Sequence, residues 1–136
     1  MSKNIEPVQN TELAGRVAEG EDYEKLMVAA RAAAGRKAGD MVAIDIRKIA
    51  SFAEFFLICS GTSTRQVKAI ADEVQEQLRV ERGSRPLHVE GYEKSEWILM
   101  DYGDLIVHVF VQESRDFYQL ERLWRDAARV QLPADL

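Results

Sequence analysis

Apolar and polar positions alternate along the chain in patterns that predict helices and strands from about residue 22 onward. Residues 22–37 place apolar side chains on one side at helical spacing, which predicts a helix that begins at Asp22 and ends before Gly39. Residues 41–47 alternate apolar and polar side chains and predict a strand with one buried face. Residues 55–60 are apolar throughout and therefore predict a central strand of the sheet.

The clearest predicted element is a helix that follows Ser63. Ser63 and Gln66 fit a capping box, in which each side chain satisfies the backbone N–H of the other residue. Gly83 ends the helix. Between these signals lies an apolar stripe at helical spacing: Val67, Ile70, Ala71, Val74 and Leu78.

The second half of the chain predicts three short strands and a last helix. The strands cover about residues 86–89, 96–101 and 104–111. The helix covers about 116–130, and its predicted buried face is formed by Phe117, Leu120, Trp124 and either Ala127 or Ala128. Together the elements predict an α/β fold with a single mixed β-sheet, in which three helices are enough to cover one sheet face only.

The chain of 136 residues fits one domain with one sizeable core. Residues 1–20 are mostly polar and predict a flexible N-terminal tail, with one helical turn near Thr11–Val17. The domain itself is predicted over 21–132, followed by a short C-terminal tail over 133–136.

Two of the predicted strands form a hairpin with distinct faces. A two-residue turn at Tyr102 and Gly103, where glycine supplies a positive φ, would pair Trp97 with His108. Alternation then separates the side chains. One face is pure core and consists of Ile98, Met100, Leu105, Val107 and Val109. The other face mixes aromatic, acidic and aliphatic residues: Trp97, Leu99, Asp101, Asp104, Ile106, His108 and Phe110.

The mixed face of the hairpin predicts a protein-docking surface. Large aromatic side chains beside charged ones are typical of an interface centre with a polar rim. The alternative is that another helix or the N-terminal tail covers this face, with His108 hydrogen-bonded inside.

The charge distribution favours a basic protein as the partner. The net charge is −5, and residues 86–112 hold five acids and one base, 1 − 5 = −4. No dense basic patch suits phosphates, so we expect no sequence-specific nucleic-acid binding. The alternative is a solvated acidic surface that only aids solubility. One cysteine fits a reducing cytoplasm, and no apolar run approaches the ~20 residues that span a bilayer, so we expect a soluble, cytoplasmic protein.

The sequence contains little that could catalyse a reaction. His88 and His108 stand singly, without metal-ligand spacing, and Cys59 lies in an apolar strand. The segment 60–63 resembles the strand-to-helix opening of nucleotidyltransferase-like domains. Those enzymes also need two acids, two residues apart on the next strand, whereas Asp101 and Asp104 are three apart across a turn. We therefore expect no enzymatic activity, no metal and no cofactor.

Six segments resemble the Iojap/RsfS family of ribosomal silencing factors and follow one another in the same order as in that family. Together the resemblance covers roughly residues 24–130. These segments are 55–63, 66–72, 90–91, 97–104, 107–110 and 115–124. The resemblance implies a nucleotidyltransferase-like fold that lacks the catalytic acids. It also implies a homodimer when free, and binding to the large ribosomal subunit through its ribosomal protein fourteen. The resemblance further implies that such binding blocks joining of the small subunit and represses translation.

The family's contact strand implies six site residues at or near the docking surface: Trp97, Leu99, Asp101, Tyr102, Asp104 and His108. Two other functions stay open, a nucleotidyltransferase-like enzyme and a large-subunit assembly factor.

Overall fold

The structure, a computed structural model, describes residues 20–136, so the tail and helical turn predicted before Gly20 lie outside the described residues. The elements are α2 (Glu21–Gly35), β1 (Gly39–Asp45), β2 (Phe55–Gly61), α3 (Thr64–Arg82), β3 (His88–Glu90), β4 (Trp97–Asp101), β5 (Leu105–Val111), α4 (Gln112–Tyr118), α5 (Leu120–Leu123) and β6 (Ala128–Val130).

The strands form one six-stranded sheet in the order β3-β4-β5-β2-β1-β6. The neighbours β2 and β5 run parallel, and every other pair is antiparallel, which confirms the predicted single mixed sheet. Both central strands are buried along their whole length. Strand β1 is also buried on both faces, since Ala43 and Ile44 are each almost fully covered, so the prediction of one buried face is wrong.

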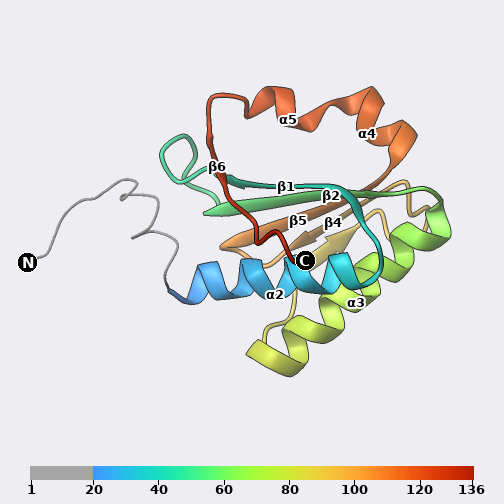
Figure 1. Cartoon of the computed structure of the whole chain (residues 1–136), viewed down its shortest axis with the longest axis horizontal. Helices are drawn as coiled ribbons and strands as arrows, with labels where there is room; N and C mark the ends of the chain where they lie inside the picture. The colour runs from blue at the N-terminus through green and yellow to red at the C-terminus, as the bar shows by residue number, and fades with distance from the viewer. Residues whose placement is uncertain (1–19) are drawn as a thin grey trace, which may run out of the picture.

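Helices cover both faces of the sheet (Figure 1). α2 and α3 lie on one face, and α4 and α5 lie on the other. The prediction that helices cover one face only is therefore wrong. The prediction failed because residues 116–130 do not form the single helix that was expected. That segment breaks at Gln119, where φ is 49°, into two short helices, and it ends in strand β6.

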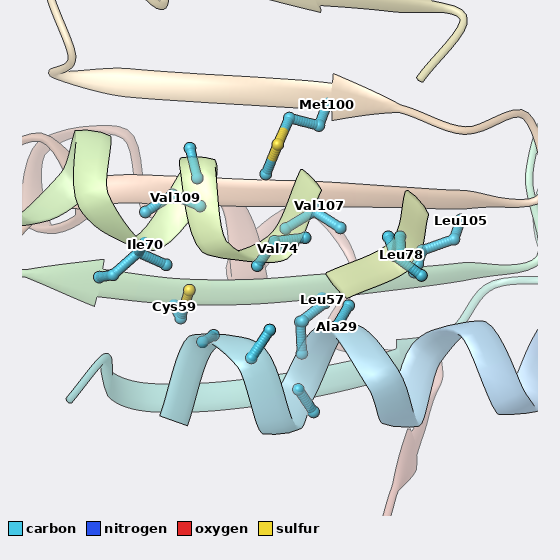
Figure 2. Close-up of a cluster of buried hydrophobic side chains, with 14 of the residues drawn as sticks. Ala29, Leu57, Cys59, Ile70, Val74, Leu78, Met100, Leu105, Val107 and Val109 are labelled. Carbon is cyan, nitrogen blue, oxygen red and sulfur yellow. The ribbon is translucent and has the colours of Figure 1, made fainter. Parts of the chain in front are cut away.

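The first core lies between α2, α3 and the sheet and consists mainly of aliphatic side chains (Figure 2). The stripe predicted on α3 is buried here in full. Facing it are alternate residues of the sheet, including Leu57, Met100 and Val107, all fully buried. The predicted stop at Gly83 is confirmed, and this residue adopts a left-handed conformation with φ at 61°. α2 ends earlier than predicted, at Gly35, and begins at Glu21 after the N-cap residue Gly20.

The capping box at the start of α3 is half confirmed. The Ser63 hydroxyl accepts the Gln66 backbone N–H at 3.1 Å. The Gln66 side chain, however, accepts the N–H of Thr62 at 2.7 Å instead of that of Ser63. The same side chain donates to the carbonyls of Arg36 and Lys37, so it also ties the end of α2 to the start of α3.

The hairpin turn lies one residue later than predicted. Tyr102 donates its N–H to the Leu105 carbonyl at 2.8 Å, so the turn residues are Gly103 and Asp104. Gly103 takes the positive φ of 88°, and the Asp101 carboxylate accepts its N–H at 2.8 Å. The pairing shifts by two residues. Trp97 therefore faces Phe110 instead of His108, but an even shift keeps each strand residue on its predicted face.

Candidate functional site

Trp97 is the largest partly exposed side chain on the predicted docking face. Strand alternation directs it away from the first core, because its neighbour Ile98 is fully buried in that core. The Trp97 indole stacks on the Phe110 ring, with centroids 4.7 Å apart and an interplanar angle of 28°. The Tyr118 ring lies 5.0 Å from it. The indole is therefore packed against the protein but remains partly open to a partner.

His108 lies below the surface on the same face, with only 3% of its area exposed. Its Nδ1 accepts the Trp97 indole N–H at 3.1 Å, while burial lowers the pKa of the imidazole to about 3. The alternative in which His108 is hydrogen-bonded inside the protein is thus the arrangement observed. The His108 ring packs against a second core on this face. This core is formed by Ile44, Ile46, Ala53, Phe56, Ile58, Ile106, Phe110 and Leu120.

Leu99 and Asp101 are half-buried next to Trp97 on strand β4. Leu99 stands opposite His108 and packs on the second core. Asp101 holds the hairpin turn through Gly103, and its other carboxylate oxygen lies 3.8 Å from His88 Nδ1 on the edge strand β3. Trp97, Leu99 and Asp101 therefore line one face of a single strand, as predicted.

Tyr102 and Asp104 do not share that face. Tyr102 is 6% exposed and belongs to the first core, where burial raises the pKa of its hydroxyl to about 12. Asp104 pairs with Lys25 of α2 at 3.1 Å. Burial raises the pKa of this carboxyl, Asp22 adds to the rise, and Lys25 opposes it. The assignment of Asp104 to the Trp97 face is wrong because Asp104 belongs to the turn, where strand alternation no longer directs side chains.

The α4–α5 segment adds exposed apolar residues that the sequence prediction missed. Phe117, predicted to be buried, is 79% exposed, and Tyr118 and Leu123 are also exposed. Phe117 and Tyr118 form an edge-to-face pair at 5.0 Å, and Tyr118 in turn contacts Trp97. No pattern in the sequence marks these side chains as exposed, because their exposure follows from the break of the helix at Gln119. We call Trp97, Leu99, Asp101, Phe117 and Tyr118 the Trp97 surface.

The groups that could suggest catalysis are engaged in the fold. Ser60, the first residue of the segment that resembles nucleotidyltransferase openings, accepts a hydrogen bond from the buried guanidinium of Arg115 at 3.2 Å. Arg115 is itself neutralised by Glu121 at 2.7 Å. Burial raises the pKa of the Cys59 thiol to about 12. Within residues 20–136, no group of three or more His, Cys, Asp or Glu side chains could hold a metal ion.

Three comparisons with known proteins agree on one family. The family model described as ribosomal silencing factor during starvation matches residues 19–136. The ribosomal silencing factor RsfS of Halalkalibacterium halodurans is 44% identical over 111 residues, which are 82% of this chain and 94% of the relative. A crystal structure of a Chromobacterium violaceum protein superimposes with a TM-score of 0.75 at 36% identity, over 85% of this chain and 92% of the other.

A more distant relative is the mouse protein named mitochondrial assembly of ribosomal large subunit protein 1. It is 30% identical over 90 residues, which are 64% of this chain and 39% of the relative. Among residues 20–136, no helix is long and apolar enough to cross a membrane. The family match spans the whole sheet and both helical layers, and the chain belongs to the RsfS family of ribosomal silencing factors.

Proposed function

We propose that this protein binds the large ribosomal subunit through its ribosomal protein fourteen and thereby prevents the small subunit from joining. The contact uses the Trp97 surface, and translation is repressed by steric exclusion without any catalytic step. The observation that carries the proposal is the partly exposed indole of Trp97, in contact with the exposed ring of Tyr118, which pairs with the exposed ring of Phe117. Exposed aromatic groups of this kind supply most of the binding free energy in many protein interfaces.

Three of the six residues implied by the family resemblance would touch the partner directly. Trp97, Leu99 and Asp101 are partly exposed on one strand face. Tyr102 and His108, both almost fully buried, would support that face from within. Asp104 would act through its ion pair with Lys25, which holds the hairpin turn against α2. The partly exposed carboxylate of Asp101 beside Trp97 suits a basic protein surface.

The proposal is tested by co-sedimentation of the purified protein with separated ribosomal subunits. We expect the wild type to sediment with the large subunit and not with the small one. Trp97→Ala should weaken binding about a hundredfold, equivalent to ~2.7 kcal/mol, because the truncation removes the centre of the contact. Ile98→Val is the matched control, since Ile98 is the next residue on the same strand but faces the first core.

Two outcomes would contradict the proposed site or partner. A folded Trp97→Ala variant that still binds the large subunit with wild-type affinity would show that the docking surface lies elsewhere. Binding that survives on large subunits lacking ribosomal protein fourteen would show that the partner is wrong.

A role in assembly of the large subunit is the second candidate. The name of the mouse relative refers to assembly of the mitochondrial ribosomal large subunit, and this favours the candidate. The two roles separate in a strain depleted of the protein. The assembly role predicts immature large-subunit particles during growth. The silencing role predicts mature subunits that join when they should stay apart.

When free, the protein is proposed to form a homodimer in the cytoplasm. The exposed apolar side chains of Leu123 and Phe117 support self-association, because such residues are costly to leave in water when they gather on one segment. Analytical ultracentrifugation of the wild type and of Leu123→Lys tests this. A wild type that stays monomeric at micromolar concentration would exclude the dimer.

A further inference from the structure

The indole of Trp97 is held by two kinds of contact. Phe110 stacks on it from the strand opposite, and Tyr118 contacts it from α4. Stacking of aromatic rings does not distinguish the two orientations of the indole that differ by a half turn about χ2, because both present a ring face to the neighbour. A hydrogen bond is directional, so the bond from Nε1 to His108 Nδ1 at 3.1 Å selects the orientation in which Nε1 faces His108.

His108 has no other hydrogen-bonding task among the described residues. Its Nε2 is buried and has no partner in residues 20–136. The ring packs between apolar neighbours, with Phe56 in a T-shaped arrangement at 4.8 Å and Phe110 stacked at 6.3 Å. A leucine would fill such a place without leaving an unsatisfied polar nitrogen, whose burial is unfavourable. The one polar contact that the imidazole makes is with the exposed tryptophan.

We propose that His108 is a positioning residue, which holds the Trp97 indole in the orientation that docks on the partner. This inference rests on the function proposed above. His108 touches no partner itself, because it is 3% exposed, and it acts only by accepting the indole N–H. The acceptor must be the neutral imidazole, with its proton on Nε2, because a proton on Nδ1 would face the indole N–H.

A matched pair of substitutions separates positioning from packing. Leucine and asparagine have nearly the same branched shape, but only asparagine offers an oxygen near the place of Nδ1. His108→Leu should lower affinity for purified large subunits about tenfold, the usual effect of losing one hydrogen bond. His108→Asn should retain affinity within about threefold. In a Trp97→Phe background, which has no indole N–H, the two substitutions should have equal effects on affinity.

The indole resonances report on the hydrogen bond independently of the ribosome. The chain has two tryptophans, so a ¹⁵N–¹H spectrum shows two indole signals, and Trp97→Phe assigns them. The Trp97 signal should move upfield in His108→Leu and stay near its wild-type position in His108→Asn. The signal of Trp124 should stay unchanged in both, which also reports that each variant is folded.

Failure of the positioning role and failure of the proposed function give different results. If the Trp97 signal is the same in wild type and His108→Leu, or if His108→Leu binds large subunits as tightly as His108→Asn, the positioning role is overturned. If the wild type fails to bind large subunits, the proposed function fails. The positioning of Trp97 is then decided by the indole signal alone, where a selective upfield shift in His108→Leu supports it.

Discussion

The two faces of the sheet are built from the same strands and differ in what covers them. The face toward α2 and α3 is closed by two long helices, and its core is built almost entirely of aliphatic side chains, with the buried ring of Tyr102 at its edge. The face toward α4 and α5 is covered by two short helices, and its core contains a buried histidine and several aromatic rings. Large aromatic side chains remain exposed only around this second cover, at Phe52, Phe117 and Tyr118, among residues 20–136.

This difference suggests a division of tasks between the faces. The first face supplies the stability of the domain, because complete burial of apolar area is the main favourable term in folding. The second face gives up part of that burial and keeps Trp97 and its neighbours available to a partner. Substitutions that are chemically identical should therefore have opposite consequences on the two faces.

The largest expected effect comes from truncating the same side chain on each face. Leu57→Ala, in the first core, should lower the free energy of unfolding by about 3 kcal/mol, because Leu57 is fully buried. Leu99→Ala, on the second face, should lower it by about 1 kcal/mol, because Leu99 is only partly buried. Urea unfolding measures both values. Equal losses would mean that the two faces contribute equally to stability.

Affinity for the large subunit should show the reverse order. Leu99→Ala should weaken binding about tenfold, since Leu99 neighbours Trp97 on the same strand face, whereas Leu57→Ala should leave the affinity of the folded protein unchanged. If Leu57→Ala weakened binding more than Leu99→Ala did, the division of tasks would be refuted.

The contrast between the faces also explains which features could be predicted from the sequence. The strands, the α3 stripe and the alternation at Ile98 and Met100 follow from local periodicity, and the first core confirms them. The cover of the second face could not be predicted in this way. A left-handed backbone at Gln119 breaks the helix, although glutamine is an ordinary helix former, so tertiary packing outweighs local propensity there.

The candidate site was predictable to a smaller extent. Alternation placed Trp97 and Leu99 together correctly, and an even shift in pairing did not disturb them. The turn residue Asp104 was misplaced because strand alternation stops at the turn. The burial of His108 depends on α4 and α5 folding back over the sheet, and no short-range pattern contains that information.

The next largest effect concerns pH and is confined to the second face. Burial lowers the pKa of His108 to about 3, whereas an unfolded histidine titrates near 6.5. Below pH 6.5 the unfolded chain takes up a proton that the folded chain does not, so the free energy of unfolding falls as the pH drops toward 3. Between pH 7 and pH 5 the free energy of unfolding should fall by about 2 kcal/mol more in the wild type than in His108→Asn.

This pH effect is measured by urea unfolding of both proteins at pH 7, 6 and 5. All other titrating groups are common to the two chains, so their difference isolates His108. Curves that run parallel across this range would show that His108 is not held neutral by burial, and the second face would then resemble an open surface more than a core.

The smallest expected effect concerns the charge of Asp101 on the Trp97 surface. Asp101→Asn keeps an acceptor for the Gly103 N–H but removes the charge, so the turn should stay intact. Association with large subunits should slow about threefold at low salt, and the difference should vanish at high salt, since rim charges mainly steer the encounter. Glu76→Gln on α3 is the control, because it makes the same change in charge on the other face. If both substitutions slowed association equally, the effect would come from the net charge of the protein and not from the position of Asp101.

A protein bound to the large subunit through the Trp97 surface should leave no room for the small subunit. Light scattering during reassociation of purified subunits tests it most directly, with wild type, Trp97→Ala or Ile98→Val added to the large subunit first. At a one-to-one molar ratio to the large subunit, we expect the wild type and Ile98→Val to prevent joining. Trp97→Ala should allow the subunits to join. Normal joining of subunits to which the wild type is demonstrably bound would contradict steric exclusion.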